Sequence, residues 1–466
     1  MRPVRQPGQG GGGCCHTESK FNARHGRDHR TMTTTAQSTP LAEQPEQAIR
    51  EQLSHWHDQY NGLGGGNLKL DLSRGKPGVE QVSLSDGLDG LLQGNYIAAD
   101  GTDTRNYGGT RGIQEARELG AQIMGVPVEH TIAAGNSSLS IMHLVLRSAM
   151  DLGLWGDERR WSNNTSATNR PKLLAPVPGY DRHFVLTRHF DIDLIPIPMT
   201  EHGPDMAAAN AAVADPSVKG IWCVPKYSNP TGCTYSDEVV EQMAALANTA
   251  AADDFVVLWD NAYAVHDLYE TGDALASVFT AATAAGTLDH VVQFASTSKI
   301  THAGAGVAFA SASTTVLDAL DKHYSVLTVG HDKVNQLRHV RFLQGRLAEH
   351  MAAHAAIIRP KFELVEEIFC RELGGLGIAS WTKPRGGYFV SLDVPPGLAG
   401  KIIAMAKAVG LTLTPAGATF PNGDDPQDRN IRIAPTFGSL EEIHAAMDIL
   451  TLCIKTASAE QILDRG

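Results

Sequence analysis

The chain has 466 residues, of which 42% are hydrophobic and 19% charged, and its formal net charge at pH 7 is -12. This composition is typical of a globular protein that is long enough for two domains. The acidic balance argues against binding nucleic acid or an anionic membrane, because such surfaces gather lysine and arginine. The sequence has no run of about 18 apolar residues and no apolar stretch behind its basic N-terminus. We therefore expect a cytoplasmic protein with small ligands, and the six scattered cysteines fit that compartment.

The first segment, residues 1–40, is rich in glycine, arginine and threonine and has almost no large apolar side chains. Such a segment cannot offset the entropy of ordering, so we expect it to be disordered. Met32 is a candidate for the true start, which would make residues 1–31 an artefact of the gene boundary. Cys14-Cys15-His16 has metal-binding residue types but no second ligand pair, so we expect no metal site there.

Helices and strands alternate through the middle of the chain. An amphipathic helix over 45–60 and a short strand over 68–72 come first, and a strand over 131–134 lies between helices at 112–124 and 139–150. The strands expected next are 172–177, 192–197, 218–224, 255–259 and 290–295, with helices at 180–189, 205–214, 236–250 and 272–284. This order predicts a mostly parallel sheet covered on both faces, with functional residues at the carboxyl ends of its strands.

The last third of the chain changes character. It begins with long helices at 333–348 and 357–373, and continues with strands at 378–382, 386–393, 411–414 and 430–433 and helices at 398–409 and 438–455. We expect residues 41–75 to pack on this smaller unit, residues 76–330 to form the large cofactor-binding domain, and residues 331–466 to hold linking helices and the small domain.

Polar residues stand where the expected strands end. Lys299 lies between the apolar runs 290–295 and 307–310, in a connection between two strands, although a lone lysine in a loop is usually solvated. Asp260 closes the apolar run 255–259, where a carboxylate is costly unless it meets a cation or a hydrogen-bond donor. The alternative for Asp260 is a helix cap.

Two further features admit a functional and a structural interpretation. Gly135-Asn-Ser-Ser138 joins a strand to a helix, which suits either a bound phosphate or a routine helix cap. Arg432 lies between two strand isoleucines and so points opposite to them, into solvent or into a cleft.

The order of these features resembles the class I aminotransferases, which are fold-type I pyridoxal-phosphate enzymes. The similarity extends from about residue 45 to about residue 456. Five segments are closely similar to the divergent aspartate aminotransferase subgroup called Ic: Leu72-Ser-Arg-Gly-Lys-Pro77, Thr102-Asp-Thr-Arg-Asn-Tyr-Gly-Gly109, Pro176-Val-Pro-Gly-Tyr-Asp-Arg-His-Phe184, Trp259-Asp-Asn-Ala-Tyr-Ala-Val-His266 and Asp332-Lys-Val-Asn-Gln-Leu-Arg-His339. The resemblance implies an α/β fold, with a mostly parallel seven-stranded sheet in the large domain and a smaller α+β C-terminal domain.

The same resemblance implies pyridoxal 5′-phosphate, held as a Schiff base on Lys299, which would also move the proton at the substrate α-carbon. Asp260 would pair with the ring nitrogen of the cofactor. Asn229 and Tyr263 would hydrogen-bond the ring 3-oxygen, and Tyr180 would stack on the ring. Stacking contributes only about 0.5–1.5 kcal/mol beyond burial, so Tyr180 should tune the cofactor more than anchor it.

The remaining implied roles concern the phosphate and the substrate. The phosphate would be bound by the turn that begins at Gly135, through the backbone of Asn136 and Ser137. The hydroxyls of Ser137, Ser138, Ser296 and Ser298 would add to it, with Tyr107 of the partner subunit. A homodimer with shared active sites is therefore implied. Arg432 would clamp the substrate α-carboxylate beside Asn229, because its planar guanidinium suits two parallel hydrogen bonds. Gly75 would let the N-terminal segment close over the substrate.

The sequence departs from this family at one position. Most relatives carry an arginine for the cofactor phosphate a few residues after the lysine, whereas Lys299 is followed by Ile-Thr-His-Ala-Gly-Ala-Gly. His302 and Ser298 are the nearest replacements. The cation for the distal carboxylate of a dicarboxylic substrate is not identified by any pattern; the candidates are Arg74, Lys226, Lys333 and Arg338, and we favour Arg74 because it adjoins Gly75.

The expected activity is transamination between aspartate and 2-oxoglutarate by a ping-pong mechanism. Alternatives on the same scaffold are an aromatic or alanine aminotransferase or a carbon–sulfur lyase, because a fold does not decide the reaction. A transcription regulator would need a folded DNA-binding module before the first helix, and a non-catalytic homologue would not need Lys299, Asp260, Asn229 and Arg432 together.

Overall fold

The computed structural model describes residues 39–64, 68–166 and 168–465. The predictions for Met32, for Cys14-Cys15-His16 and for disorder over residues 1–38 fall outside these ranges. No helix in the described ranges is long and apolar enough to cross a membrane.

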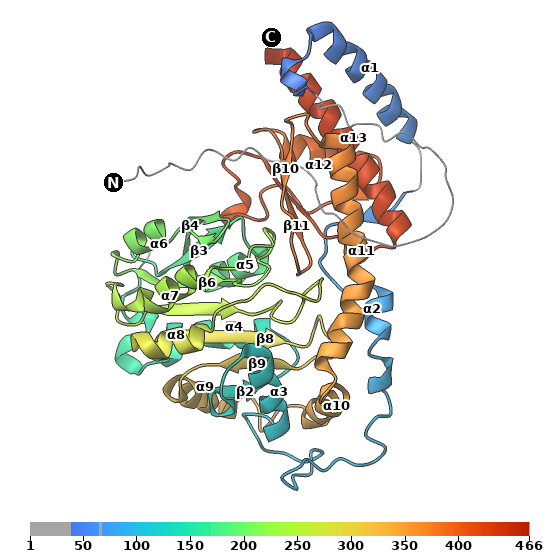
Figure 1. The fold of residues 1–466 in the computed structure, drawn as a ribbon. Helices are drawn as coiled ribbons and strands as arrows, with labels where there is room; N and C mark the ends of the chain where they lie inside the picture. Colours follow the sequence, from blue (N-terminus) through green and yellow to red (C-terminus); the bar gives the residue numbers. More distant parts are fainter. Residues whose placement is uncertain (1–38, 65–67, 167, 466) are drawn as a thin grey trace, which may run out of the picture.

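A central sheet of eight strands organises the large part of the molecule, in the order β2-β9-β8-β7-β6-β3-β4-β5 (Figure 1). Its strands are β2 (Thr131–Ala133), β9 (Ala308–Ser311), β8 (Val291–Ser296), β7 (Val256–Asp260), β6 (Val218–Cys223), β3 (Lys172–Val177), β4 (Asp193–Thr200) and β5 (Gly203–Pro204). The pairs from β4 through β3, β6 and β7 to β8 are parallel, and β9, β2 and β5 join antiparallel. The carboxyl ends of the parallel strands therefore meet at one edge.

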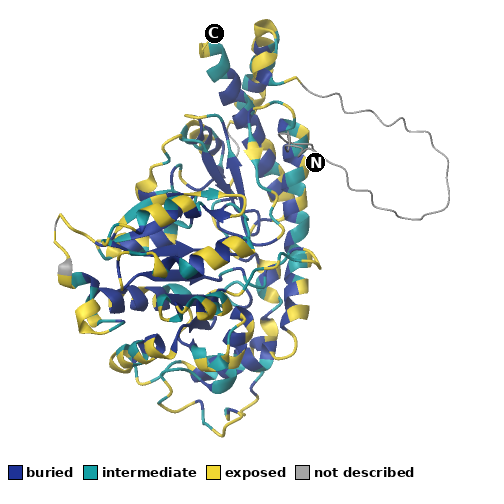
Figure 2. Ribbon diagram, turned by 60° about the vertical axis from the view of Figure 1, so that its left-hand side comes forward, coloured by how far each residue is buried: buried dark blue, intermediate teal, exposed yellow. Residues whose placement is uncertain are grey.

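Both faces of this sheet are buried. Successive side chains of a strand point to opposite sides, so each buried strand contributes to two cores. In β7, Val256 and Leu258 pack into the core on one face and Val257 and Trp259 into the core on the other. Helices cover both faces, and their outer surfaces carry the exposed residues in Figure 2. The helices are α4 (Ser138–Arg147) and α9 (Thr314–Leu327) on the first face, and α6 (Met206–Ala212), α7 (Asp237–Ala245) and α8 (Val278–Ala285) on the second.

The structure corrects several boundaries. The sheet has eight strands rather than seven, because the two residues of β5 fold back onto the end of β4. Helix α8 begins at Val278 rather than near residue 272, and strand β11 begins at Val390 rather than at residue 386. The two long helices are α10 (Lys333–Leu343) and α11 (Leu347–Leu373), and the break lies at Gly345, whose φ of +69° is incompatible with a continuous helix.

The C-terminal part forms a smaller layer against the carboxyl edge of the sheet (Figure 1). Its antiparallel sheet has the order β10-β11-β13, and helices α12 and α13 pack beside it. Strand β1 (Leu70–Asp71) pairs with β12 in parallel, and α1 (Glu46–Leu63) lies along α13. The bounds of the other elements are β10 (Ser380–Trp381), β11 (Val390–Asp393), α12 (Ala399–Ala408), β12 (Leu411–Thr412), β13 (Asn430–Ile433) and α13 (Leu440–Arg465). The domain boundaries at residues 75 and 330 stay a prediction.

Glycine packing holds α3 (Gln114–Met124) close to the edge of the central sheet. A Cβ atom on Gly120 would stand 2.5 Å from Cδ1 of Phe309 in β9, which is closer than real contacts allow. Gly62 of α1 offers the opposite case, because nothing lies within 4 Å of a Cβ added there. Helix α3 can therefore take this position only with glycine at residue 120.

We predict that Gly120→Ala lowers the urea midpoint of unfolding, because the added methyl group forces α3 away from β9 at a cost of about 1–3 kcal/mol. The matched variant Gly62→Ala should keep or slightly raise the midpoint, since alanine favours a helix more than glycine. Circular dichroism during a urea titration measures both. Equal midpoints for the two variants would contradict the packing argument.

Four histidines are buried around the connection between β8 and β9: His266, His339, His350 and His354. His266 and His354 contact the carbonyl oxygens of Lys299 and Ile300 through Nε2, at 3.3 and 2.8 Å, and His339 contacts the hydroxyl of Thr301 at 2.9 Å. Burial lowers the pKa of His266 to about 3 and the pKa values of His339 and His354 to about 4. These three rings are therefore neutral near neutral pH.

These depressed pKa values predict how stability depends on pH. Between pH 6.5 and about 4 the unfolded chain binds protons at these histidines that the folded chain does not bind, so stability is full above 6.5 and falls with the pH. Melting curves between pH 8 and pH 4.5 should show this fall. His339→Gln should make the slope shallower, whereas the exposed His55→Gln should leave it unchanged. A slope that is the same in both variants would contradict the prediction.

Candidate active site

A cavity of about 240 Å³ opens at the carboxyl edge of the central sheet. The ends of β6, β7 and β8 contribute to it, together with the start of α4 and the connection after β8. Its lining residues are Asn136, Ser137, Ser138, Leu139, Tyr180, Val224, Asn229, Asp260, Ala262, Tyr263, Ser296, Ser298, Lys299 and Ala303. Residues far apart in the sequence meet here because parallel strands end at one edge.

Asp260 ends β7 and is buried. Its Oδ2 lies 3.0 Å from Nε2 of His183, which is buried too, whereas its Oδ1 has no hydrogen-bond partner in the described part of the chain. The ring of His183 stacks on Trp222, with centroids 4.2 Å apart and an angle of 11° between the planes. The carboxylate is therefore held in place by one oxygen and offers the other to the cavity.

Lys299 projects from the connection between β8 and β9, as the sequence predicts. Its Nζ lies 5.0 Å from the centre of the Tyr263 ring, a distance typical of a cation–π contact. Burial lowers the pKa of Lys299, and the negative charge of Asp260 opposes this shift. The lysine is thus easier to deprotonate than a solvated one, and the aspartate sits close enough to act on its charge.

The turn before α4 forms the serine-lined end of the cavity. Gly135 has a φ of +66°, which turns the chain from β2 into the first residues of the helix. The side chain of Asn136 donates to the carbonyl of Gly304 at 3.2 Å, and the hydroxyl of Ser298 donates to the carbonyl of Asn136 at 3.2 Å. These two bonds tie the turn to the lysine connection, so the hydroxyl groups around it converge on one place.

Arg432 lies on β13 beside the cavity and points into the protein rather than into solvent. Its Nη1 donates to Asp181 at 2.7 Å and to the side-chain oxygen of Asn229 at 3.4 Å. Its guanidinium lies 5.0 Å from the centre of the Phe389 ring, and a Cβ atom on Gly75 would stand 2.2 Å from that ring. A larger residue at position 75 would therefore displace the Phe389 ring, which packs against Arg432.

Several candidates for the missing cations lie away from the cavity. Lys226 pairs with Asp267 at 2.8 Å, and Lys333 donates to the carbonyl of Tyr107 at 3.2 Å. Arg338 donates to Asn335 at 2.7 Å. None of these three basic residues is among the described residues that line the cavity.

Gly75, Gly135 and Arg432 adjoin the cavity without being among its described lining residues, and three further residues that the sequence singled out also lie outside the lining. Arg74 is exposed, and His302 faces Asp86, with Nε2 and Oδ1 4.0 Å apart. Tyr107 is 84% exposed. Among the described lining residues Lys299 is the one basic side chain, and four serines line the same cavity: Ser137, Ser138, Ser296 and Ser298.

Sequence reasoning gave no role to Asp181 and His183, although both stand in a segment that carries the family resemblance. Asp181 is the first residue of α5 (Asp181–His189), and the helix places His183 and Tyr180 side by side, with ring centroids 4.9 Å apart. The spacing of three residues at a helix start was the available signal, because residues three apart share a helix face. The partners of both side chains come from distant strands, which the sequence does not show.

The described ranges contain no group of three or more histidine, cysteine, aspartate or glutamate side chains arranged to hold a metal ion. The donor set of the cavity consists of hydroxyl, amide, carboxylate and amino groups. This set suits an organic ligand with a phosphate and a basic ring nitrogen better than a metal.

Comparison with known proteins finds relatives that match nearly the whole chain. The family model for aspartate amino-transferase matches residues 45–465. An aspartate aminotransferase of Corynebacterium glutamicum is 43% identical over 418 residues, which cover 88% of this chain and 95% of that protein.

Solved structures share the fold. The crystal structure of an aspartate transaminase from Corynebacterium glutamicum matches with a TM-score of 0.87 and 41% identity, covering 91% of this chain and 100% of that one. An alpha-aminoadipate aminotransferase from Thermus thermophilus matches with a TM-score of 0.69 at 21% identity, covering 87% of this chain and 99% of that one. The predicted resemblance is confirmed, and the chain belongs to the aspartate aminotransferase family of fold-type I aminotransferases.

Proposed function

We propose that this aminotransferase transfers the amino group of aspartate to 2-oxoglutarate, using pyridoxal 5′-phosphate, by a ping-pong mechanism. The observation that carries the proposal is the cavity in which Lys299, Asp260 and Tyr263 meet beside Arg432. The similar proteins from Corynebacterium glutamicum are named for aspartate, which supports this choice of amino donor.

The cavity fits the cofactor by its donors and acceptors. The free Oδ1 of Asp260 is buried, so it would gain most from a protonated ring nitrogen, which needs an acceptor in the same buried place. Asn229 and Tyr263 would bind the ring oxygen, and Tyr180 would lie against the ring. When bound, the cofactor supplies a ring that accepts electron density from the substrate α-carbon.

Hydroxyl groups would hold the phosphate in place of an arginine. Ser137, Ser138, Ser296 and Ser298 line the cavity, and the first of them stands at the N-cap position of α4, where free backbone N–H groups and the helix dipole favour an anion. Such hydrogen bonds can replace an ion pair, because each bond to the charged phosphate is strong and several of them act on the same group.

Lys299 would carry the proton during the reaction. Burial lowers its pKa, so a larger fraction of the amine is neutral near pH 7 than in a solvated lysine. Its Nζ would hold the cofactor before the substrate arrives, and would afterwards accept the proton released at the substrate α-carbon.

Arg432 would bind the substrate α-carboxylate. Its guanidinium is already oriented by Asp181 on one side and by the Phe389 ring on its face, so little side-chain entropy is lost on binding. The backbone at Gly75 would complete this end of the site by closing over the bound amino acid. The distal carboxylate needs a further cation, and Arg74, next to Gly75, stays our candidate.

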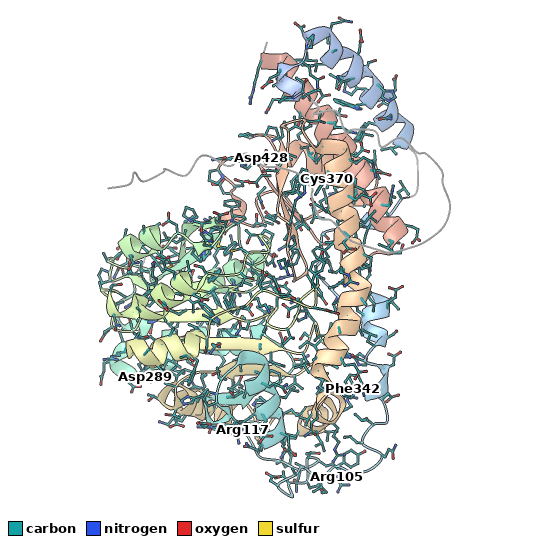
Figure 3. The ribbon with its side chains drawn as sticks, viewed as in Figure 1. Arg105, Arg117, Asp289, Phe342, Cys370 and Asp428 are labelled. Carbon is teal, nitrogen blue, oxygen red and sulfur yellow. The ribbon has the colours of Figure 1, made fainter. Side chains whose placement is uncertain are left out.

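We also propose a homodimer with shared active sites. Tyr107 is 84% exposed, and Val326, Leu327 and Val329 are 86%, 67% and 65% exposed. The N–H of Gly108 donates to the carbonyl of Val329 at 3.0 Å, so these apolar side chains belong to one surface. Figure 3 shows Arg105, two residues before Tyr107, at an end of the molecule. An exposed apolar surface of this kind is typical of an interface, and Tyr107 of the partner subunit would then reach the phosphate.

The cytoplasm is the proposed location, because the scattered cysteines and the small, charged substrates suit that compartment. In the described residues Cys223, Cys233 and Cys453 are free thiols.

The proposed reaction is tested in two halves. The enzyme loaded with pyridoxal 5′-phosphate should release one equivalent of oxaloacetate from aspartate, and should then form glutamate when 2-oxoglutarate is added. Alanine and aromatic amino acids are the comparison donors. Fumarate and ammonia, or alanine and carbon dioxide, as products of aspartate would identify a different reaction and would overturn the proposal.

The attachment residue is tested by reduction with borohydride and peptide mapping. The peptide that contains Lys299 should carry the reduced cofactor, and Lys299→Ala should lose the label and nearly all activity. Lys407→Ala, at an exposed position of α12, is the control and should keep both. Label on another lysine in the wild-type enzyme would show that the cofactor is held elsewhere.

The role of Arg432 is tested by Arg432→Lys. Lysine keeps the charge but loses the planar pair of donors, so kcat/KM for aspartate should fall about 10- to 100-fold, with most of the change in KM. Arg429→Lys, three residues earlier, keeps the charge that faces the surface carboxylate of Asp393 on β11, so it should change kcat/KM less than about twofold. Equal effects of the two variants would remove Arg432 from the substrate site.

A further inference from the structure

The main chain at Lys299 is held by four side chains that the proposed chemistry does not use. Tyr388 and His266 each lie 3.3 Å from the carbonyl oxygen of Lys299. His350 and His354 lie 2.7 and 2.8 Å from the carbonyl oxygen of Ile300. These donors come from three separate parts of the chain, so two successive peptide groups are fixed from several directions.

Gln81 completes this arrangement from α2 (Val79–Ser83). Its Oε1 accepts the backbone N–H of Gly78 at 3.1 Å, which can only donate, so the amide nitrogen must face the other way. That nitrogen lies 3.0 Å from the hydroxyl of Tyr388 and 3.3 Å from Nδ1 of His354. The side chain of Gln81 is fully buried.

The orientation of Gln81 sets the hydrogens of its neighbours. Because its amide donates to Nδ1 of His354, that ring carries its hydrogen on Nε2 and donates it to the carbonyl of Ile300. Tyr388 accepts from Gln81 and is left to donate its own hydrogen to the carbonyl of Lys299. In the series of hydrogen bonds that runs from Gly78 through Gln81 and Tyr388 to Lys299, every bond therefore has one donor and one acceptor.

The donors are neutral, which matters beside a lysine that must lose its proton. Burial lowers the pKa of His350 and holds the pKa values of His266 and His354 at about 3 and 4. A protonated ring here would repel the ammonium form of Lys299 and change its chemistry. The neutral rings instead provide hydrogen bonds without adding a charge.

The same group of side chains adjoins the proposed substrate end of the site. Phe389 follows Tyr388 in the chain, and its ring packs between Gly75 and Arg432. Gly78 is three residues after Gly75, and its N–H belongs to the bonded chain. Helix α11, which carries both histidines, runs on from this point along the small domain (Figure 1).

We propose that Gln81, Tyr388, His266, His350 and His354 are positioning residues for Lys299. They fix the carbonyls on its own and the following residue, and so set the direction in which its side chain enters the cavity. An amine that must reach both the cofactor and the substrate α-carbon loses rate when its position shifts by a fraction of an ångström. This inference rests on the proposed role of Lys299.

The test compares two buried tyrosines in the enzyme loaded with pyridoxal 5′-phosphate. Tyr388→Phe keeps the ring and removes the hydroxyl; we expect kcat with aspartate to fall about tenfold while KM changes less than twofold. The visible circular dichroism of the bound cofactor should also weaken, because its orientation on Lys299 becomes less fixed. Tyr235→Phe, an equally buried tyrosine outside the group, should leave kcat and the spectrum unchanged.

A second pair of variants separates positioning from packing. His354→Leu removes one of the two histidine contacts to the Ile300 carbonyl, and the acceptor of the Gln81 amide, and should lower kcat. His354→Gln keeps a donor at the same reach and should restore most of it. Gln81→Leu should resemble His354→Leu. The melting temperature of each variant is measured beside its kinetics, and variants of equal stability are compared.

Two outcomes would overturn the inference. One is an unchanged kcat and visible spectrum in Tyr388→Phe and His354→Leu. The other is the same loss in Tyr235→Phe, or in His354→Gln, as in the variants that lack the donor. A wild-type enzyme that binds the cofactor but does not transaminate aspartate would count against the proposed function instead, since the visible spectrum still reports the orientation on Lys299.

Discussion

The buried carboxylate of Asp260 constrains everything around it. A charge at the end of a strand that is covered on both faces costs several kcal/mol unless donors surround it. One oxygen is supplied by His183, whose ring is fixed by stacking on Trp222, and the other has no partner among the described residues. The second oxygen of Asp260 can therefore accept a hydrogen bond from one more donor. Lys299, Tyr180 and Tyr263 line the same cavity.

The proposed role of Lys299 depends on its backbone as much as on its side chain. Its pKa is lowered by burial, and the groups that hold its peptide bonds are neutral for the same reason. Burial thus lowers the pKa of Lys299 and the pKa of His266 alike. Buried polar groups are stable only when each donor meets an acceptor. The hydrogen bonds that connect Gly78, Gln81, Tyr388 and Lys299 meet this requirement.

The smaller domain completes the site from the other side. Arg432 comes from β13 but finds its partners on α5 and at the end of β6, so the two parts of the molecule share one arginine. The Phe389 ring packs against it, and Gly75 packs against that ring, which any side chain at residue 75 would displace. In the proposed function, these few contacts would join substrate recognition to the cofactor chemistry.

The sequence alone determined the alternation of strands and helices, the place of Lys299 between β8 and β9, and the place of Asp260 at the end of β7, because these follow from local periodicity and chain order. The family order of motifs also pointed to Arg432 and Asn229. Only the tertiary structure decided that Asp181 pairs with Arg432, that His183 supports Asp260, and that Gln81 reaches Tyr388 across more than three hundred residues. The edge strand β5 and the break at Gly345 were missed for a related reason: two residues and one left-handed glycine leave almost no periodic signal. Contacts between side chains far apart in the chain depend on how the layers pack, and no local pattern records that packing.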